Sequence, residues 1–120
     1  MAGMRYIVDD VEVAVEFYRD ALGFTVKMHN PGHFAALTRE DLTLFVNSPG
    51  SGSAGKAGGT PEPGGWNRIQ IVTRDLEALI ASLEEKGVRF RGEIAEAQAG
   101  RQIRVEDPAG NPGELFEYSD

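Results

Sequence analysis

The sequence predicts an α+β domain built from two tandem units, each with one strand, one helix and three further strands. Segments 10–23 and 75–87 follow one pattern: an Asp at the start, apolar residues at helical spacing, and a Gly at the end. They lie 65 positions apart in a chain of 120 residues. This spacing is half the chain, so we interpret the pattern as a duplication and not as a short solenoid repeat.

The first unit is predicted to contain four strands and one helix. Residues 4–9 are rich in strand formers, and Asp10 after them is the predicted N-cap of the helix, which Gly23 ends. The apolar face of this helix consists of Val11, Ala14, Val15, Tyr18 and Leu22. The other strands are predicted over residues 24–29, 33–38 and 42–47.

The second unit repeats this order. A strand over 66–73 precedes a helix that begins after Asp75 and ends at Gly87. Apolar residues of this helix share one face: Leu76, Leu79, Ile80 and Leu83. Further strands are predicted over 88–94, 101–105 and 113–118.

The predicted division is one domain over residues 1–120, with a first module at about 1–47, a connector at 48–65 and a second module at about 66–120. The connector is rich in Gly and Pro, so we interpret it as a flexible linker, with a ligand lid as the alternative.

Charge and composition exclude several classes of function. The chain has 12 Lys and Arg against 19 Asp and Glu, a net charge of −7, which disfavours nucleic acid as a partner. This charge weakly favours a neutral or cationic ligand over an anionic one. The chain has no Cys, so disulfides, thiolate metal sites and a Cys nucleophile are excluded. No signal-like or membrane-spanning apolar stretch is visible, so we expect a cytoplasmic protein without a membrane partner.

Two motifs are interpreted as coincidental. Residues 50–55 match the phosphate-binding pattern G-x-G-x-x-G, but the Gly- and Pro-rich residues that follow cannot form the helix that this motif requires. His29 and His33 flank a predicted turn, and we expect them to be solvated or capping side chains. Acidic residues of the helices lie off the apolar faces and are expected to be solvated: Glu16, Glu77, Glu84 and Glu85.

Three segments resemble the vicinal oxygen chelate superfamily, which includes glyoxalase I, extradiol dioxygenases and bleomycin-resistance proteins. They are Val-Asp-Asp-Val at 8–11, Glu-Phe-Tyr-Arg-Asp-Ala-Leu-Gly-Phe at 16–24, and Asp-Pro-Ala-Gly-Asn-Pro-Gly-Glu-Leu-Phe-Glu at 107–117. The resemblance implies two βαβββ modules whose eight strands form a curled mixed sheet around a cleft.

Metal-using members of this superfamily hold a divalent ion with four side chains. Matched to this sequence, those positions fall on Gly3, on Thr43 or Phe45, on Arg68 and on Glu114. Only Glu114 is a usual ligand type, because glycine has no side chain, guanidinium stays protonated, and neither Thr43 nor Phe45 is a typical ligand. We therefore expect neither a metal nor another cofactor.

Strand alternation predicts which side chains face the cleft. The predicted ligand-binding residues are Arg5, Phe45, Trp66, Arg68, Gln70, Glu114 and Phe116. Arg68 and Glu114 carry opposite charges at two former metal positions, and we expect them to form an ion pair. The alternative is that the aromatic residues simply fill a closed interior.

Three functions remain open at this point. The first is a metal-independent protein that binds a small organic molecule between the modules, as in bleomycin resistance, and this is the interpretation we favour. The second is a lyase, isomerase or dioxygenase that uses Glu114 as its base, or an atypical metal site with His29 or His33. The third is a structural or partner-binding module. We also expect a homodimer, because sheet edges are otherwise open to unwanted pairing.

Overall fold

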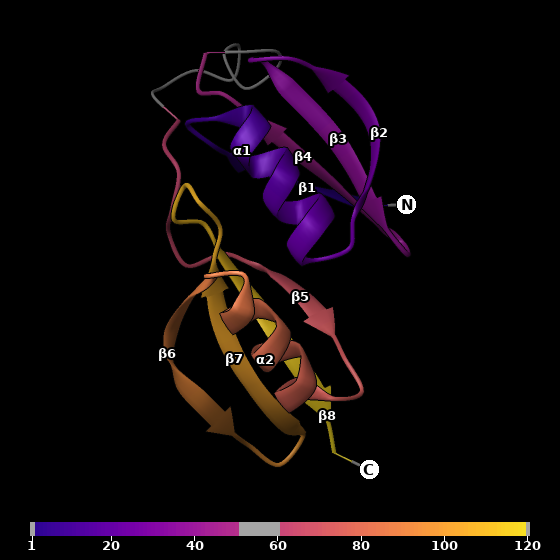
Figure 1. Ribbon diagram of the computed structural model, residues 1–120, viewed down its shortest axis with the longest axis vertical. Helices are drawn as coiled ribbons and strands as arrows, with labels where there is room; N and C mark the ends of the chain where they lie inside the picture. The colour runs from indigo at the N-terminus through magenta and orange to yellow at the C-terminus, as the bar shows by residue number, and fades with distance from the viewer. Residues whose placement is uncertain (1, 51–60, 120) are drawn as a thin grey trace. The chain divides into compact units, whose positions relative to one another are not determined.

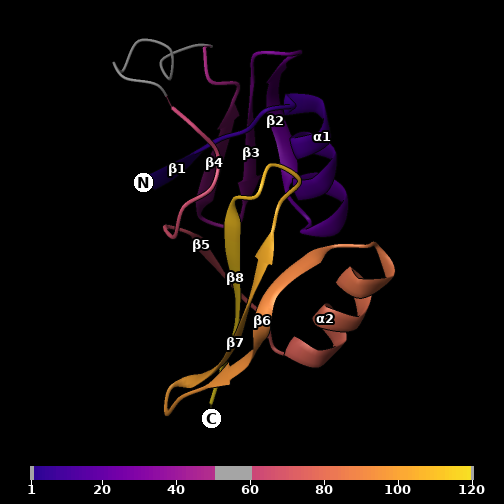
Figure 2. The same cartoon turned by 90° about the vertical axis from the view of Figure 1, so that its left-hand side faces the viewer.

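The protein, seen in a computed structural model that describes residues 2–50 and 61–119, forms two compact units. One unit comprises Met1–Gly64 and Pro108–Asn111, and the other comprises Gly65–Asp107 and Pro112–Asp120. Each contains a four-stranded mixed sheet with a helix against it (Figures 1 and 2). The predicted α+β fold of two tandem modules is confirmed, with the strands arranged as two sheets of four.

The first unit has the predicted element order. Its strand order is β1-β4-β3-β2, in which β1 runs parallel to β4 and the other neighbours are antiparallel. The elements are β1 (Ala2–Ile7), α1 (Val11–Glu16), the π-helical turn η1 (Phe17–Ala21), β2 (Thr25–Asn30), β3 (Phe34–Arg39) and β4 (Leu42–Asn47).

The helical segment of the first unit is held by the residues that the sequence pattern singled out. The Asp10 side chain accepts a bond from the Val13 amide at 3.2 Å, as an N-cap does. All five predicted apolar-face residues are buried. Gly23 has φ 76°, and the Phe24 amide donates to the Tyr18 carbonyl at 2.9 Å, so the segment ends in a glycine C-cap.

The second unit repeats this topology with the strand order β5-β8-β7-β6, in which β5 runs parallel to β8. The elements are β5 (Ile69–Val72), α2 (Leu76–Glu85), β6 (Arg89–Glu96), β7 (Gly100–Glu106) and β8 (Pro112–Tyr118). Leu76 and Leu83 of α2 are fully buried. The side chains of Ile69, Ile71 and Leu115 are buried as well, as expected for the sheet face that packs against the helix.

The first strand of the second unit is shorter than predicted. Ladder pairing begins with Ile69 opposite Gly113, whereas the sequence predicts a strand from Trp66. The Trp66 carbonyl instead accepts a bond from Nη1 of Arg68 at 3.2 Å. Residues 66–68 therefore form an approach to the sheet and not a part of it.

The turn at 107–111 connects the two units along the chain. Asn111 is buried, and its side chain donates to the Ile7 carbonyl at 2.8 Å and accepts from the Gly64 amide at 2.7 Å. Residues 108–111 consequently belong to the first unit although the strands around them belong to the second.

Two predictions concern residues that the structure does not describe. The G-x-G-x-x-G match and the choice between linker and lid fall largely on residues 51–60, which lie outside the described residues.

Within the described ranges, no helix has both the length and the apolar character needed to cross a bilayer.

Candidate functional site

The sheet of the second unit has one face directed away from α2, which we call the second open face. Glu114 of β8 stands opposite Gln70 of β5 on one side and Arg104 of β7 on the other. Two residues along β8, Phe116 stands opposite Gln102. Residues paired across strands project to the same side of a sheet, so these five side chains share this face.

An ion pair lies at the centre of the second open face. Oε1 of Glu114 accepts from Nε of Arg68 at 3.0 Å and lies 2.9 Å from Nη2 of the same guanidinium. Oε2 accepts from Nε2 of Gln70 at 2.9 Å. The predicted pair of Arg68 and Glu114 is thus confirmed, with one difference: two nitrogens of the guanidinium contact the same oxygen, and the other oxygen accepts from Gln70.

Trp66 stands near the ion pair and is 75% exposed. The guanidinium carbon of Arg91 lies 5.6 Å from the centre of its ring, within the range of a cation–π contact. Arg91 in turn donates to Oε2 of Glu106 at 2.6 Å. The indole is therefore oriented by a charged side chain while most of its surface stays in water.

The apolar end of this face is formed by Phe116 and its neighbours. The Phe116 and Tyr118 rings lie 4.7 Å apart, with Phe116 nearly buried and Tyr118 57% exposed. Val72, opposite Phe116 on β5, is 48% exposed. A hollow of about 460 Å³ lies beside Val72 and Tyr118, and Thr73 and Arg74 also line it. The hollow thus combines the exposed side chains of Val72 and Tyr118 with polar residues, and small-molecule sites use such combinations.

On the corresponding face of the first unit, an arginine over an aromatic ring stands in place of the ion pair. Arg5 stands opposite Phe45, and its guanidinium carbon lies 4.9 Å from the centre of the Phe45 ring. Nη1 of Arg5 also donates to Oδ1 of the buried Asn47 at 2.6 Å. This cluster orients a cation over an aromatic ring and contains no carboxylate.

The seven predicted ligand-binding residues therefore fall into two groups, each within one unit. Arg5 and Phe45 meet in the first, and the other five lie on or beside the second open face. Sequence reasoning missed Asn47, Gln102 and Arg104. The signal was present, because period-two alternation puts Asn47 on the side of Phe45 and separates Gln102 and Arg104 from the buried Ile103 and Val105.

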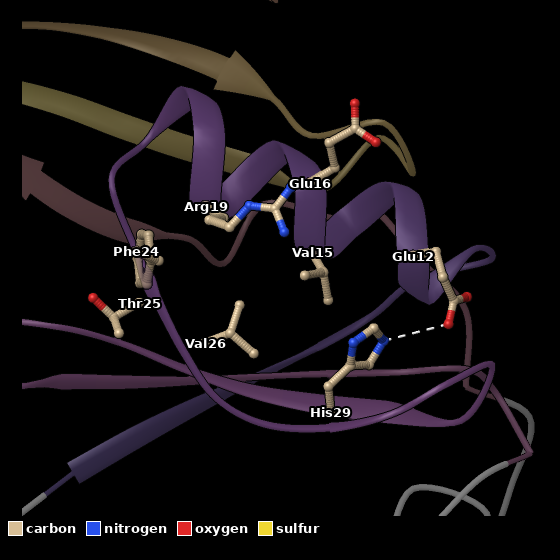
Figure 3. A pocket seen from close by; sticks show the side chains of 8 residues that line it. All are labelled: Glu12, Val15, Glu16, Arg19, Phe24, Thr25, Val26 and His29. Carbon is tan, nitrogen blue, oxygen red and sulfur yellow. Dashed lines mark hydrogen bonds and ion pairs between the residues drawn. The ribbon is translucent and has the colours of Figure 1, made fainter.

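A second hollow, of about 600 Å³, lies between α1 and β2 in the first unit (Figure 3). His29 is 3.3 Å from Oε1 of Glu12, which also accepts from the Gly32 amide at 2.7 Å. These contacts, with the Gly32 amide as the larger cause, lower the pKa of Glu12. Arg19 is engaged by Asp20. Because most polar groups here already have partners, this hollow is a weaker candidate than the open faces.

Comparison with known families identifies the fold group. The family model described as Glyoxalase/Bleomycin resistance protein/Dioxygenase superfamily matches residues 2–115. The chain belongs to this superfamily. A comparison with curated proteins finds no significant match.

Solved structures of the superfamily align with nearly the whole chain. A member from Sphaerobacter thermophilus is 27% identical, with a TM-score of 0.80 over 98% of this chain and 95% of that chain. TnmS3, an antibiotic binding protein from a Streptomyces species, is also 27% identical, with a TM-score of 0.71 over 99% and 97%. Lactoylglutathione lyase from Agrobacterium tumefaciens has a TM-score of 0.78 over 98% of this chain and 92% of that chain, and at 18% identity this likeness shows the fold alone.

The metal site of metal-using superfamily members does not fit the residues of this chain. The carboxylate oxygens of Glu114 are engaged by Arg68 and Gln70. Gly3 has no side chain to offer, and a Cβ at this position would lie 3.0 Å from Cε2 of Phe45, a contact so tight that the aromatic ring would have to shift. Among the residues that the structure describes, no three His, Cys, Asp or Glu side chains gather as a metal site requires.

Proposed function

We propose that this protein binds a small organic molecule without a metal, on the open faces of its sheets. The observation that carries the proposal is that both carboxylate oxygens of Glu114 already accept hydrogen bonds from the protein. This carboxylate is the single ligand-type residue at the four superfamily metal positions, and Arg68 and Gln70 take both of its oxygens. The partly exposed aromatic and aliphatic side chains beside it then provide surface for an organic ligand.

Similarity to a binding protein supports the same proposal. The chain is 27% identical to a Streptomyces protein described as antibiotic binding, over nearly the full length of both. An antibiotic or a related natural product is therefore the first class of ligand to test. The cleft between the modules, the cytoplasmic location and the homodimer stay predictions.

The enzyme alternative keeps one specific observation in its favour, the presence of a nearly buried carboxylate at Glu114. As a general base it would have to accept a substrate proton on an oxygen that already receives N–H donors. An atypical metal site would need His29 or His33, and His29 is paired with Glu12 beside α1.

Equilibrium binding tests the proposed function. Trp66 is the only tryptophan, so its fluorescence reports on the second open face directly. A panel of aromatic natural products and simple naphthalenes is titrated into metal-free protein, with calorimetry as the independent measurement. We expect saturable binding of at least one compound, with the compound recovered unchanged. Absence of binding across the panel, or turnover of the bound compound, contradicts the proposal.

Elemental analysis tests metal independence. We expect purified, untagged protein to contain far less than one equivalent of zinc, nickel, manganese or iron per chain, because no complete donor set is present at the superfamily positions. About one equivalent that is lost in Glu114→Gln would show a metal site at Glu114. Loss in His29→Gln or His33→Gln would instead locate an atypical site in the first unit.

A further inference from the structure

The second open face carries more positive than negative side chains, although the whole chain is net negative. Four arginines and two glutamates belong to this face or its rim, in a chain with a net charge of −7. They are Arg68, Arg89, Arg91, Arg104, Glu106 and Glu114. Charge recognition is local, so this excess of arginine matters more for a bound molecule than the net charge of the chain does.

Both glutamates of this face form ion pairs with arginines. Glu114 pairs with Arg68 at 2.9 Å between the charged groups. Glu106 pairs with Arg91 at 2.6 Å and lies 3.8 Å from the more exposed Arg89. Each carboxylate of the face thus has an arginine partner of its own.

Arg104 is left without a carboxylate in the part of the chain that the structure describes. Nη1 donates to Oε1 of Gln102 and Nη2 to the carbonyl of Arg91, both at the long distance of 3.4 Å. A guanidinium has five N–H donors, so these bonds use a minority of them. The residue is half-buried. A cation removed from water in this way gains from an anion brought to it.

The backbone of β6 makes room for this guanidinium. The register of β6 and β7 shifts after Arg91, and Gly92 in the shifted segment has φ 72°. A Cβ at Gly92 would lie 3.2 Å from Nη2 of Arg104. A glycine at this position therefore permits both the backbone conformation and the arginine beside it.

We infer that Arg104 anchors the anionic group of the ligand, and that the ligand is an organic anion with an apolar body. The inference rests on the proposed function and adds the class of ligand. Gln102, which contacts Arg104, stands opposite Phe116, so the apolar surface of Phe116, Val72 and Tyr118 continues directly from the cation. An aromatic carboxylate satisfies both parts: two parallel bonds to the guanidinium and ring contact with the apolar end.

A matched pair of probes tests this inference. 2-Naphthoate and 2-naphthamide have the same ring system and differ in charge. Calorimetry and Trp66 fluorescence give the affinities of both for the wild-type chain, for Arg104→Gln and for Arg101→Gln. The last is the matched control, because Arg101 lies on the same strand but binds Glu77 and Glu117 on the side of α2. Thermal melts verify that each variant is folded.

We expect the wild-type chain to bind 2-naphthoate about tenfold more tightly than 2-naphthamide, as for a charge-assisted bidentate contact. Arg104→Gln should lose this preference while retaining affinity for the amide, and Arg101→Gln should keep the preference. Added salt should weaken binding of the naphthoate and leave the naphthamide unchanged, a readout that needs no variant.

The possible failures are distinguishable. Equal affinity of the wild-type chain for both probes, or a preference that persists in Arg104→Gln, overturns the role of Arg104 and leaves the proposed function intact. Absence of binding for both probes and for the broader panel contradicts the proposed function, and the inference falls with it.

Discussion

At the level of single residues, Glu114 determines the chemistry available to the second open face. It is 9% exposed and sits between Gln70 and Arg104 in the ladder. A buried carboxylate without partners would be costly, and Arg68 and Gln70 supply N–H donors to both of its oxygens. The Arg68 guanidinium thus neutralises the carboxylate charge that a bound metal cation would otherwise neutralise.

The pair of Arg68 and Glu114 leads to a prediction about stability. Arg68→Met leaves Glu114 with Gln70 alone, and we expect a loss of about 2–3 kcal/mol in the free energy of unfolding, somewhat less than for a fully buried pair. Arg68→Met combined with Glu114→Gln removes both charges and should be more stable than Arg68→Met alone. Denaturant titrations of the three variants and the wild-type chain measure this.

Glu114→Gln alone completes the double-mutant cycle and is its control. If the effects of the two single substitutions add without an interaction energy, the ion pair contributes nothing and the central role given to Glu114 is wrong.

The residue scale also shows how far sequence reasoning reaches. The pair of Arg68 and Glu114 was predicted from the resemblance to the superfamily, because both residues fall on its metal positions and carry opposite charges. Strand alternation missed Arg104 because only the first and last strands of each module were considered for the cleft. The contact of Arg5 with the Phe45 ring depends on side-chain rotamers, which no periodicity encodes.

At the level of elements, local signals predicted both helix starts and one strand exactly as the structure has them. Asp10 and Asp75 cap their helices, and the predicted strand over 42–47 coincides with β4. The π-helical turn over Phe17–Ala21 was not predicted, since the four-residue spacing of Tyr18 and Leu22 fits an α-helix and a single π-helical turn lengthens the hydrogen-bond spacing by only one residue. β5 begins only at Ile69, next to Arg68, which makes a local bond to the Trp66 carbonyl and a tertiary ion pair with Glu114.

A second capping contact at α2 also comes from tertiary structure. The Leu76 amide donates to Oε1 of Glu117 at 2.7 Å, although 41 positions separate these residues. Arg101 donates to Oε2 of Glu117 at 3.2 Å and to Glu77 at 3.1 Å. The Leu76 amide, and after it Arg101, hold the pKa of Glu117 below its ordinary value. The negative charge of Glu117 therefore stabilises the start of the helix.

This contact predicts a particular dependence of stability on pH. Because the pKa of Glu117 is lower in the folded chain, its contribution is complete above the ordinary glutamate pKa of 4.5 and is lost as pH falls through the lowered value. Glu117→Gln should therefore lower the melting temperature at pH 7 and reduce the decline in stability on acidification. Thermal melts from pH 7 down to pH 3 measure both effects.

Glu84→Gln is the matched control, because Glu84 lies on the exposed side of the same helix. An unchanged melting temperature and an unchanged acid decline in Glu117→Gln would show that the contact to Leu76 does not stabilise α2.

At the level of the whole molecule, the two units share a topology and differ in the side chains of their open faces. The two sheets have equivalent strand orders, and the pairs Arg5 with Phe45 and Gln70 with Glu114 occupy equivalent places in them. One unit carries a cation over an aromatic ring, and the other a paired carboxylate beside an arginine. The repeated fold was predictable because it depends on periodic apolar positions, whereas the chemistry of each open face depends on individual residues that differ between the two units.

The last prediction concerns assembly. Each sheet ends in strands that pair on one side only within that sheet, and such edges favour pairing with another chain unless they are blocked. β6 carries a bulge and several charged residues, which oppose pairing. β2 also has a bulge but exposes the apolar side chain of Met28 at 57%, so β2 is the edge at which we expect pairing.

We expect a homodimer, with a mass by light scattering of about twice the 13.0 kDa of the chain at micromolar concentration, and a shift toward monomer in Met28→Glu. A dimer that persists in Met28→Glu uses an edge other than β2, and a mass of 13.0 kDa for the wild-type chain contradicts the prediction.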